Sequence, residues 1–200
     1  MIHGGFWRAT YGKETMHAVS TALTEAGWAT WNVEYRRVGA GGGWPQTFDD
    51  VVAARAAAPP AEPVVAIGHS AGGHLALLLA SRGLVDGAVA LGAVCDLRAA
   101  ARDQLGHGAA LALMGTQPGE AAEAWQRADP LGQAPPPVPV VVVHGVDDDT
   151  VPVSQARDYR RAAGERCTLV ELDCGHFEPI DPRSAVWPQV LDALSSVGGR

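Results

Sequence analysis

Charged residues, aromatic residues and long hydrophobic runs are all scarce in this sequence. Charged residues make up 18% and aromatic residues 6% of its 200 residues, against 47% hydrophobic residues. That apolar content suffices for a folded core and excludes intrinsic disorder. No apolar run approaches the about 18 residues that a membrane-spanning helix needs. The net charge of −7 lacks the basic excess that nucleic acid or an anionic membrane would attract, and we expect neither partner.

Cysteine is rare as well, and the N-terminus shows no targeting pattern. The three cysteines are an odd number in a chain long enough to fold without disulfides, so we expect reduced thiols. The opening stretch, MIHGGFWR, lacks the basic start and the apolar segment of a secretory signal. Both features predict a cytoplasmic protein. A length of 200 residues fits one domain, which we expect to cover 1–200.

Short apolar runs alternate with alanine-rich stretches along the chain. The runs are apolar throughout, which is typical of strands buried on both faces of a parallel sheet. Strand–helix alternation of this kind predicts an α/β protein with a doubly wound, mostly parallel sheet. The expected strands cover 28–35, 63–68, 86–94, 139–145 and 167–173, and the expected helices cover about 13–26, 47–58, 71–82, 154–164 and 184–197.

Residues 97–131 interrupt this alternation. They are rich in alanine and leucine, are broken by glycine and proline, and precede a proline cluster. One interpretation is an ordinary connection between two strands. The other is a small helical cap over the carboxyl edge of the sheet, where open α/β sheets bind their ligands.

The motif GHSAG, residues 68–72, is the strongest chemical signal in the sequence. An apolar run, 64–67, precedes it, and an apolar helical stretch, 74–81, follows it. Small residues on both sides suit a sharp strand-to-helix turn, which lifts the Ser70 hydroxyl above the sheet at the start of a helix. We therefore predict that Ser70 is a nucleophile. The alternative is a glycine-rich turn with a helix-capping serine.

A serine nucleophile needs a base, and the base needs a carboxylate that orients it. His176 follows the last expected strand, at the same sheet edge as Ser70, and is the candidate base. The carboxylate comes from the three consecutive aspartates 147–149 or from Asp96. A metal site at these carboxylates is discounted, because adjacent side chains diverge and no histidine or cysteine spacing supports it. We expect His144 to brace this acidic loop.

The N-terminal motif HGGFW, residues 3–7, is suited to binding a negative charge. Its two glycines let backbone N–H groups face a ligand with no Cβ atom in the way. In loops of this type the N–H group after the nucleophile also contributes. We predict that Gly5, Phe6 and Ala71 form an oxyanion hole, the alternative being a plain glycine turn.

Together, HGGFW, GHSAGG, HGVDDDTVP and GHF resemble the motifs of the α/β-hydrolase superfamily. Within it the chain is similar to the bacterial esterase and kynurenine-formamidase-like branch, which carries HGG-x-W, and the similarity includes EYRRVGAGGGWPQTFDDV at 34–51. The resemblance covers essentially the whole chain. It implies that the acid is Asp148, so that the triad is Ser70, Asp148 and His176. It also implies hydrolysis of carboxylic esters, or of formamides such as N-formylkynurenine, without a cofactor.

The chain departs from this family at its start. Family members normally have two strands and the body of a third before the HGG loop, whereas only Met1 and Ile2 precede His3. The third strand would be central, between 28–35 and 63–68, and its loss would leave buried backbone groups unpaired. We therefore expect Met1 to be an internal methionine of a longer chain, and the chain as given to have an α/β-hydrolase fold that lacks its first strands and to be of low stability. A shortened but genuine fold is the alternative.

These features predict a serine hydrolase that cleaves small carboxylic esters through an acyl-enzyme, with no cofactor and no metal. An arylformamidase and a short-peptide hydrolase are the alternatives among enzymes. A truncated, inactive fragment that serves as an interaction module is the alternative outside them. The expected partner is a small-molecule ester or amide, and the oligomeric state stays open.

Overall fold

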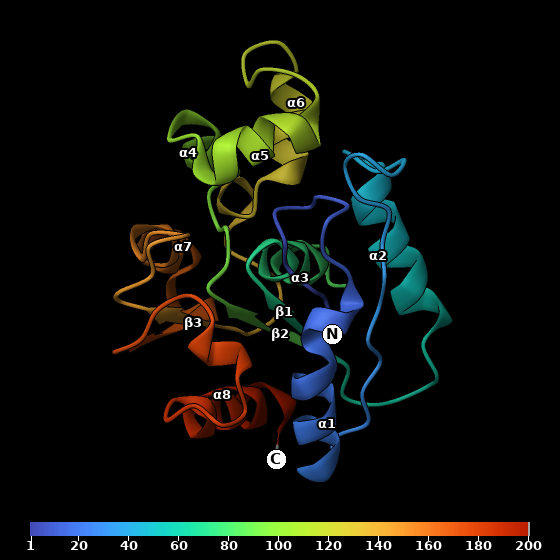
Figure 1. Cartoon of the computed structure of the whole chain (residues 1–200), viewed down its shortest axis with the longest axis vertical. Coiled ribbons are helices and arrows are strands. Elements are labelled where there is room, and N and C mark those ends of the chain that lie inside the picture. The colour runs from blue at the N-terminus through green and yellow to red at the C-terminus, as the bar shows by residue number, and fades with distance from the viewer. Residues whose placement is uncertain (200) are drawn as a thin grey trace.

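The computed structural model describes residues 1–199, which form one parallel sheet of four strands (Figure 1). The strands β1 (Val65–His69), β2 (Gly87–Leu91), β3 (Val140–Gly145) and β4 (Cys167–Leu172) lie side by side in chain order. Because all four run in the same direction, the loops that follow them meet at one edge of the sheet. This carboxyl edge is where open α/β sheets place their functional residues.

Alternate residues of each inner strand belong to two separate hydrophobic cores. In β3, Val140 and Val142 pack into one core, while Val141 and Val143 pack into the other, and all four are buried. A strand that is buried on both faces needs apolar residues at every position, which explains the continuous apolar runs in the sequence. The α/β class and the doubly wound, parallel sheet expected from the sequence are confirmed.

Helices cover both faces of the sheet. On one face α2 (Gln46–Ala57), α3 (Ala71–Ser81) and α7 (Ser154–Ala163) contribute to the first core. On the other face α1 (His17–Glu25) and α8 (Trp187–Gly198) contribute to the second core, and they lie together below the strands in Figure 1. Short 3-10 turns complete this framework: η1 (Lys13–Met16), η2 (Leu131–Gln133), η3 (Gly164–Arg166) and η4 (Glu178–Ile180).

The segment 28–35 is not a strand, which corrects the expectation drawn from its apolar character. Only Val33 is bridged, to Ile2, and Ile2 is bridged in turn to Gly68 of β1. A ladder needs a neighbouring segment of similar length, and residues 1–2 offer the segment a single paired position. The low stability expected for the chain stays a prediction.

Three helices form an insertion between β2 and β3, at 97–131. These are α4 (Leu97–Arg102), α5 (Leu105–Met114) and α6 (Ala122–Ala128), and they group together at the opposite end of the molecule from α1 and α8 (Figure 1). The helical character expected for this stretch is therefore confirmed. Within residues 1–199, every helix is too short or too polar to span a bilayer.

The insertion is attached to the loop of the HGGFW motif. Arg8 donates from its guanidinium to the carbonyl oxygens of Gly106 (2.6 Å) and His107 (3.2 Å). Both carbonyls belong to a left-handed turn at the start of α5, where Gly106, His107 and Gly108 have φ values of 56°, 55° and 75°. The predicted oxyanion loop and the helical insertion therefore hold one another in place.

Candidate active site

Ser70 occupies the turn between β1 and α3 in a backbone conformation that side chains rarely adopt. Its φ is 54° and its ψ is −118°. A Cβ atom on Gly68 would lie 2.2 Å from the carbonyl oxygen of Gly72, and one on Gly72 would lie 2.1 Å from that of Ile2. Only glycine fits at these two positions. A strained conformation of this kind costs about 1–3 kcal/mol and is concentrated at functional sites.

His176 and Asp148 are in direct contact. His176 Nδ1 lies 2.6 Å from Asp148 Oδ2, and both side chains are buried. A carboxylate only accepts hydrogen bonds, so the proton of this bond belongs to Nδ1, and Nε2 of a neutral His176 ring is left as an acceptor. This is the tautomer that a general base requires.

The second carboxylate oxygen of Asp148 is held by the backbone. Oδ1 accepts the N–H groups of Thr150 (2.9 Å) and Val151 (2.8 Å). His144 Nε2 donates to the carbonyl oxygen of Val151 at 2.8 Å and lies 3.3 Å from Asp148 Oδ2. Burial by itself would raise the pKa of Asp148, but the contacts with His144, His176 and the Val151 N–H hold that pKa well below its ordinary value. Asp148 is therefore ionised throughout the neutral range.

His69, the variable residue of the G-x-S-x-G motif, fixes the loop of the base. Its Nε2–H donates to the backbone carbonyl of His176 at 2.9 Å, and the two rings lie 4.6 Å apart. Burial lowers the pKa of His69 to about 3, so this ring stays neutral at pH 7. The sequence gives no sign of this bond, because a contact across the sheet edge leaves no local signal.

Ser70 lies beside this pair without a hydrogen bond to it. Ser70 N–H donates to the carbonyl of Leu91 at 2.8 Å, which places Ser70 next to Gly92. A Cβ atom on Gly92 would lie 3.1 Å from His176 Nδ1 and 3.3 Å from Asp148 Oδ2. Within residues 1–199 no hydrogen bond joins Ser70 Oγ to His176. In free enzymes such bonds are often long and tighten only when substrate is bound.

The HGGFW loop is pressed against the turn of Ser70. A Cβ atom on Gly4 would lie 3.1 Å from Ser70 Cβ. The next three residues, Gly5, Phe6 and Trp7, have φ values of 105°, 52° and 57°, so two non-glycine side chains adopt the left-handed region in succession. Strain in successive residues points to a functional constraint on this loop.

The segments that meet at Ser70 contain three backbone N–H groups with no hydrogen-bond acceptor within residues 1–199. In the part of the chain that the structure describes, the N–H groups of Gly5, Phe6 and Ala71 donate to no other group. Ala71 is also the first residue of α3, where the helix dipole favours negative charge. These are the three donors predicted from the sequence, and all three belong to the segments that meet at Ser70.

His3, the first residue of the HGGFW loop, is held by contacts with Gly4, Glu34 and Tyr35. Its ring is buried and stacks on Tyr35 with 4.2 Å between ring centroids. Its Nδ1 lies 2.8 Å from the carbonyl oxygen of Gly4, and its Nε2 lies 2.8 Å from Glu34 Oε1. The hydroxyl of Tyr35 donates to the carbonyl of His3 at 2.9 Å. The first residue of the HGG motif is therefore a structural brace.

The other candidate acids lie elsewhere. Asp147 and Asp149 are exposed, and Asp149 Oδ1 accepts only the hydroxyl of Thr150. Asp96 caps α4 by accepting the N–H of Ala99 at 2.7 Å. Among the described residues no group of three histidine, cysteine or acidic side chains could hold a metal ion. The geometry thus places only Asp148 against the imidazole of His176.

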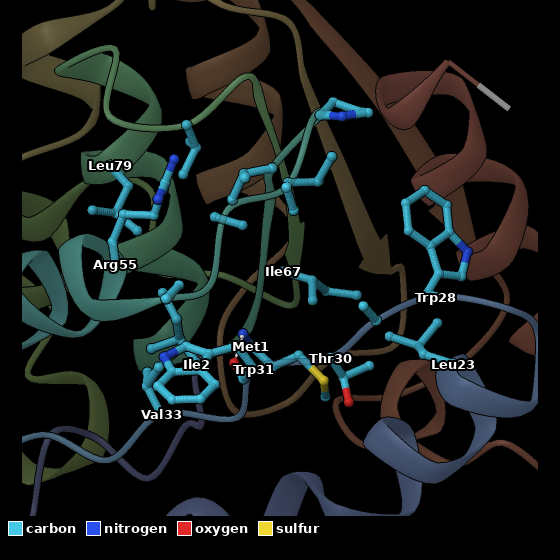
Figure 2. Close-up of a pocket in the computed structure, with 18 of the residues that line it drawn as sticks. Met1, Ile2, Leu23, Trp28, Thr30, Trp31, Val33, Arg55, Ile67 and Leu79 are labelled. Atoms are coloured by element: carbon cyan, nitrogen blue, oxygen red, sulfur yellow. Dashed lines mark hydrogen bonds between the residues drawn. The ribbon is translucent and has the colours of Figure 1, made fainter.

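A cavity of about 250 Å³ lies beyond the β1 edge of the sheet, separate from these residues (Figure 2). The segment 28–31 and Val33 line one side of it, and β1 lines the other. Met1 and Ile2 also line the cavity. None of the residues that contact Asp148 or His176 lines it. The cavity therefore does not serve the candidate catalytic residues.

Solved esterase structures share this fold. A truncated carbohydrate esterase from gut microbiota is 18% identical and superposes with a TM-score of 0.81 over 100% of this chain and 85% of that chain. An acetyl ester-xyloside bifunctional hydrolase from Caldicellulosiruptor lactoaceticus is 18% identical and superposes with a TM-score of 0.74 over 99% of this chain and 81% of that chain. A thermophilic esterase from Thermogutta terrifontis is 20% identical and superposes with a TM-score of 0.71 over 97% of this chain and 78% of that chain. At these identities the likeness concerns the fold.

The parallel sheet covered on both faces, together with the fold shared with these esterases, gives the chain an α/β-hydrolase fold. Residues 1–162 match the BD-FAE family, so the chain belongs to that family. No curated protein is similar enough in sequence to match the chain.

Proposed function

We propose that this protein hydrolyses small carboxylic esters through an acyl-enzyme formed on Ser70. The observation that carries the proposal is the 2.6 Å contact of His176 Nδ1 with Asp148 Oδ2, next to the strained turn of Ser70. The family match and the esterase structures of the same fold support it.

Acylation begins when Ser70 Oγ attacks the carbonyl carbon of the ester. His176 Nε2 takes the hydroxyl proton as the new C–O bond forms, and ionised Asp148 stabilises the imidazolium that results. The carbonyl oxygen becomes an oxyanion, which the free N–H groups of Gly5, Phe6 and Ala71 accommodate. The imidazolium then gives its proton to the departing alcohol oxygen, the bond to that oxygen breaks, and the acyl group stays on Ser70.

Deacylation repeats these steps with water. His176 Nε2 takes a proton from the attacking water, and the same three N–H groups hold the second oxyanion. The proton returns to Ser70 Oγ as the carboxylic acid leaves. Every step uses side chains and backbone groups of this chain, so the proposed mechanism involves no cofactor.

The test compares the wild type with Ser70→Ala on p-nitrophenyl acetate. Removal of the nucleophile is expected to lower kcat by a factor on the order of 10⁴ or more, because nucleophile and base act as one unit. Ser81→Ala is the matched control, since Ser81 bonds the carbonyl of Leu78 in the last turn of α3, away from the site. Equal melting temperatures of the three proteins establish that the fold is intact.

A second measurement follows the nucleophile directly. A p-nitrophenyl phosphonate should add one covalent group to the wild type, on Ser70, and none to Ser70→Ala, as read by mass spectrometry. Ser70→Ala with wild-type turnover would refute the proposal, and an unlabelled, inactive wild type would favour an interaction module. N-formylkynurenine belongs in the substrate panel because the same groups would cleave a formamide, and faster turnover of it than of any ester would make the protein an arylformamidase.

A further inference from the structure

Large hydrophobic side chains that stand in solvent are few in residues 1–199, and two of them lie at the candidate active site. The four are Tyr11 (50% exposed), Trp31 (49%), Val146 (37%) and Phe177 (64%). Single exposed apolar residues are ordinary on protein surfaces, so exposure by itself decides nothing. Tyr11 covers Gly5 of the predicted oxyanion loop, and Phe177 contacts the ring of the candidate base. Of the other two, Val146 lies in the loop of Asp148, and Trp31 lines the cavity beyond β1.

Phe177 directly follows the candidate base and contacts its ring. The two ring centroids lie 5.0 Å apart with an angle of 84° between the planes, and the ring of His69 lies 5.8 Å from that of Phe177. The backbone of Phe177 is fixed at the start of η4, where its carbonyl accepts the N–H of Ile180 at 3.0 Å. The ring is therefore anchored by two histidines and a helical turn, yet most of its surface remains open.

Tyr11 flanks the opposite component of the site, the oxyanion loop. A Cβ atom on Gly5 would lie 2.7 Å from Tyr11 Cβ and 2.8 Å from Cδ2 of its ring, so the side chain covers Gly5 closely. Its hydroxyl bonds to no protein group in the part of the chain that the structure describes. An exposed aromatic ring thus adjoins each of the two loops between which the ester carbonyl would sit.

The mechanism tells which part of a substrate Phe177 would meet. His176 Nε2 gives its proton to the departing alcohol oxygen, which must lie within hydrogen-bond reach, about 3 Å, of that nitrogen. The Phe177 ring centre is 5.0 Å from the His176 ring centre. The alcohol part is the part of the substrate nearest His176 Nε2, so a group bonded to the alcohol oxygen can come within van der Waals reach of Phe177.

We propose that Phe177 is a substrate-binding residue that stacks on the alcohol part of the ester and selects alcohols with a flat, apolar ring face. The proposal deepens the proposed function and rests on it. An aromatic ring and the C–H face of a sugar ring share this chemistry. If the Phe177 ring only supported His176, burying it would stabilise the protein more than leaving it 64% exposed beside the reacting atoms.

The experiment compares kcat/KM for phenyl acetate and ethyl acetate in the wild type and in Phe177→Ala. Both substrates form the same acetyl-enzyme, so deacylation is identical and the ratio of the two kcat/KM values reports the alcohol part alone. Loss of one ring-stacking contact is expected to lower the phenyl-to-ethyl ratio about three- to tenfold. Phe177→Trp, which keeps an aromatic face, should restore most of the ratio.

Trp31→Ala is the matched control, because Trp31 is also an exposed aromatic residue but lines the cavity beyond β1 and not the active site. It should leave the ratio unchanged. A monoacetylated methyl glucoside separates the two sources of a flat face. If Phe177→Ala loses kcat/KM to a comparable extent on this substrate, the natural alcohol is assigned as a sugar ring. If Phe177→Ala loses kcat/KM on phenyl acetate alone, the alcohol is assigned as an aryl ring.

Two results would overturn the inference while leaving the proposed function in place. One is an unchanged phenyl-to-ethyl ratio in an active Phe177→Ala enzyme. The other is an equal loss for both acetates, which would mean that Phe177 only positions His176. A wild type without Ser70-dependent turnover is a different failure, since it would overturn the proposed function and this inference together.

Discussion

Replacing Asp148 with asparagine is expected to trap His176 in an inactive tautomer, and the structure dictates why. Asp148 Oδ1 accepts two N–H groups, from Thr150 at 2.9 Å and from Val151 at 2.8 Å. In Asp148→Asn the amide oxygen must take this position, since an NH₂ group cannot accept. The NH₂ group then takes the place of Oδ2, which lies 2.6 Å from His176 Nδ1.

The magnitude follows from the proton on the imidazole. An NH₂ group donates, so His176 Nδ1 must become the acceptor, and the single proton of the neutral ring moves to Nε2. Nε2 then has no lone pair with which to take the proton of Ser70. A tautomer error of this kind lowers kcat roughly 10³- to 10⁴-fold, which corresponds to about 4–5 kcal/mol in the activation barrier. KM should change little, because the substrate contacts remain.

The assay is steady-state hydrolysis of p-nitrophenyl acetate, with thermal unfolding of each variant. Asp149→Asn is the matched control, since its side chain is exposed and away from the imidazole, and it should keep near wild-type turnover. An Asp148→Asn enzyme within about tenfold of the wild type would refute the reasoning. A large loss in Asp147→Asn or Asp149→Asn instead would move the acid to that position.

Two further predictions concern the helical insertion. Gly106→Ala should lower kcat several-fold more than Gly108→Ala. Both glycines have positive φ, but only a Cβ atom at Gly106 would meet the Phe6 ring, at 2.5 Å, and displace the predicted oxyanion loop. Equal kcat values for the two variants would contradict this coupling. Burial raises the pKa of Asp129 above its ordinary value, to about 6. The contribution of its protonated form to stability is therefore complete below about pH 4 and is lost as the pH rises through 6. Asp129→Asn should therefore raise the melting temperature at pH 8 by a few degrees relative to its effect at pH 4, and an equal effect at both pH values would argue against a raised pKa.

The strands were predictable where burial alone defines them. The runs at 63–68, 86–94, 139–145 and 167–173 correspond to β1–β4. In β1–β3 the reason is burial on both faces, which requires apolar residues at each position, whereas the outer strand β4 exposes Thr168 and Glu171. The segment 28–35 has a similar composition and forms no ladder. Only Val33 and Tyr35 of this segment are buried, so its composition predicted neither its burial nor its pairing. Pairing depends on the length of the neighbouring segment, which a local pattern does not contain.

The catalytic candidates were predictable from chain order, but their supporting contacts were not. Ser70 and His176 each follow a strand, and the ends of parallel strands meet at one edge, so topology places both at that edge. Because β1 and β4 are the outer strands of the sheet, their proximity also depends on how the loop after β4 folds. The bond from His69 to the carbonyl of His176 joins residues 107 positions apart. The exposure of Phe177 depends equally on how distant segments pack around it.

The sequence by itself determined the turn at Ser70 through Gly68, because a Cβ atom there would meet the carbonyl of Gly72 four residues later, and that requirement is local. The requirement for glycine at 72 comes from the distant backbone of Ile2 and is tertiary. Only the tertiary structure decided which of three identical neighbours, Asp147 to Asp149, meets the imidazole. Asp148 is 8% exposed while the other two stand in solvent. The loop after β3 folds back so that the N–H groups of Thr150 and Val151 bind one carboxylate oxygen and turn the other toward His176, and that geometry arises only when β3 and β4 lie side by side.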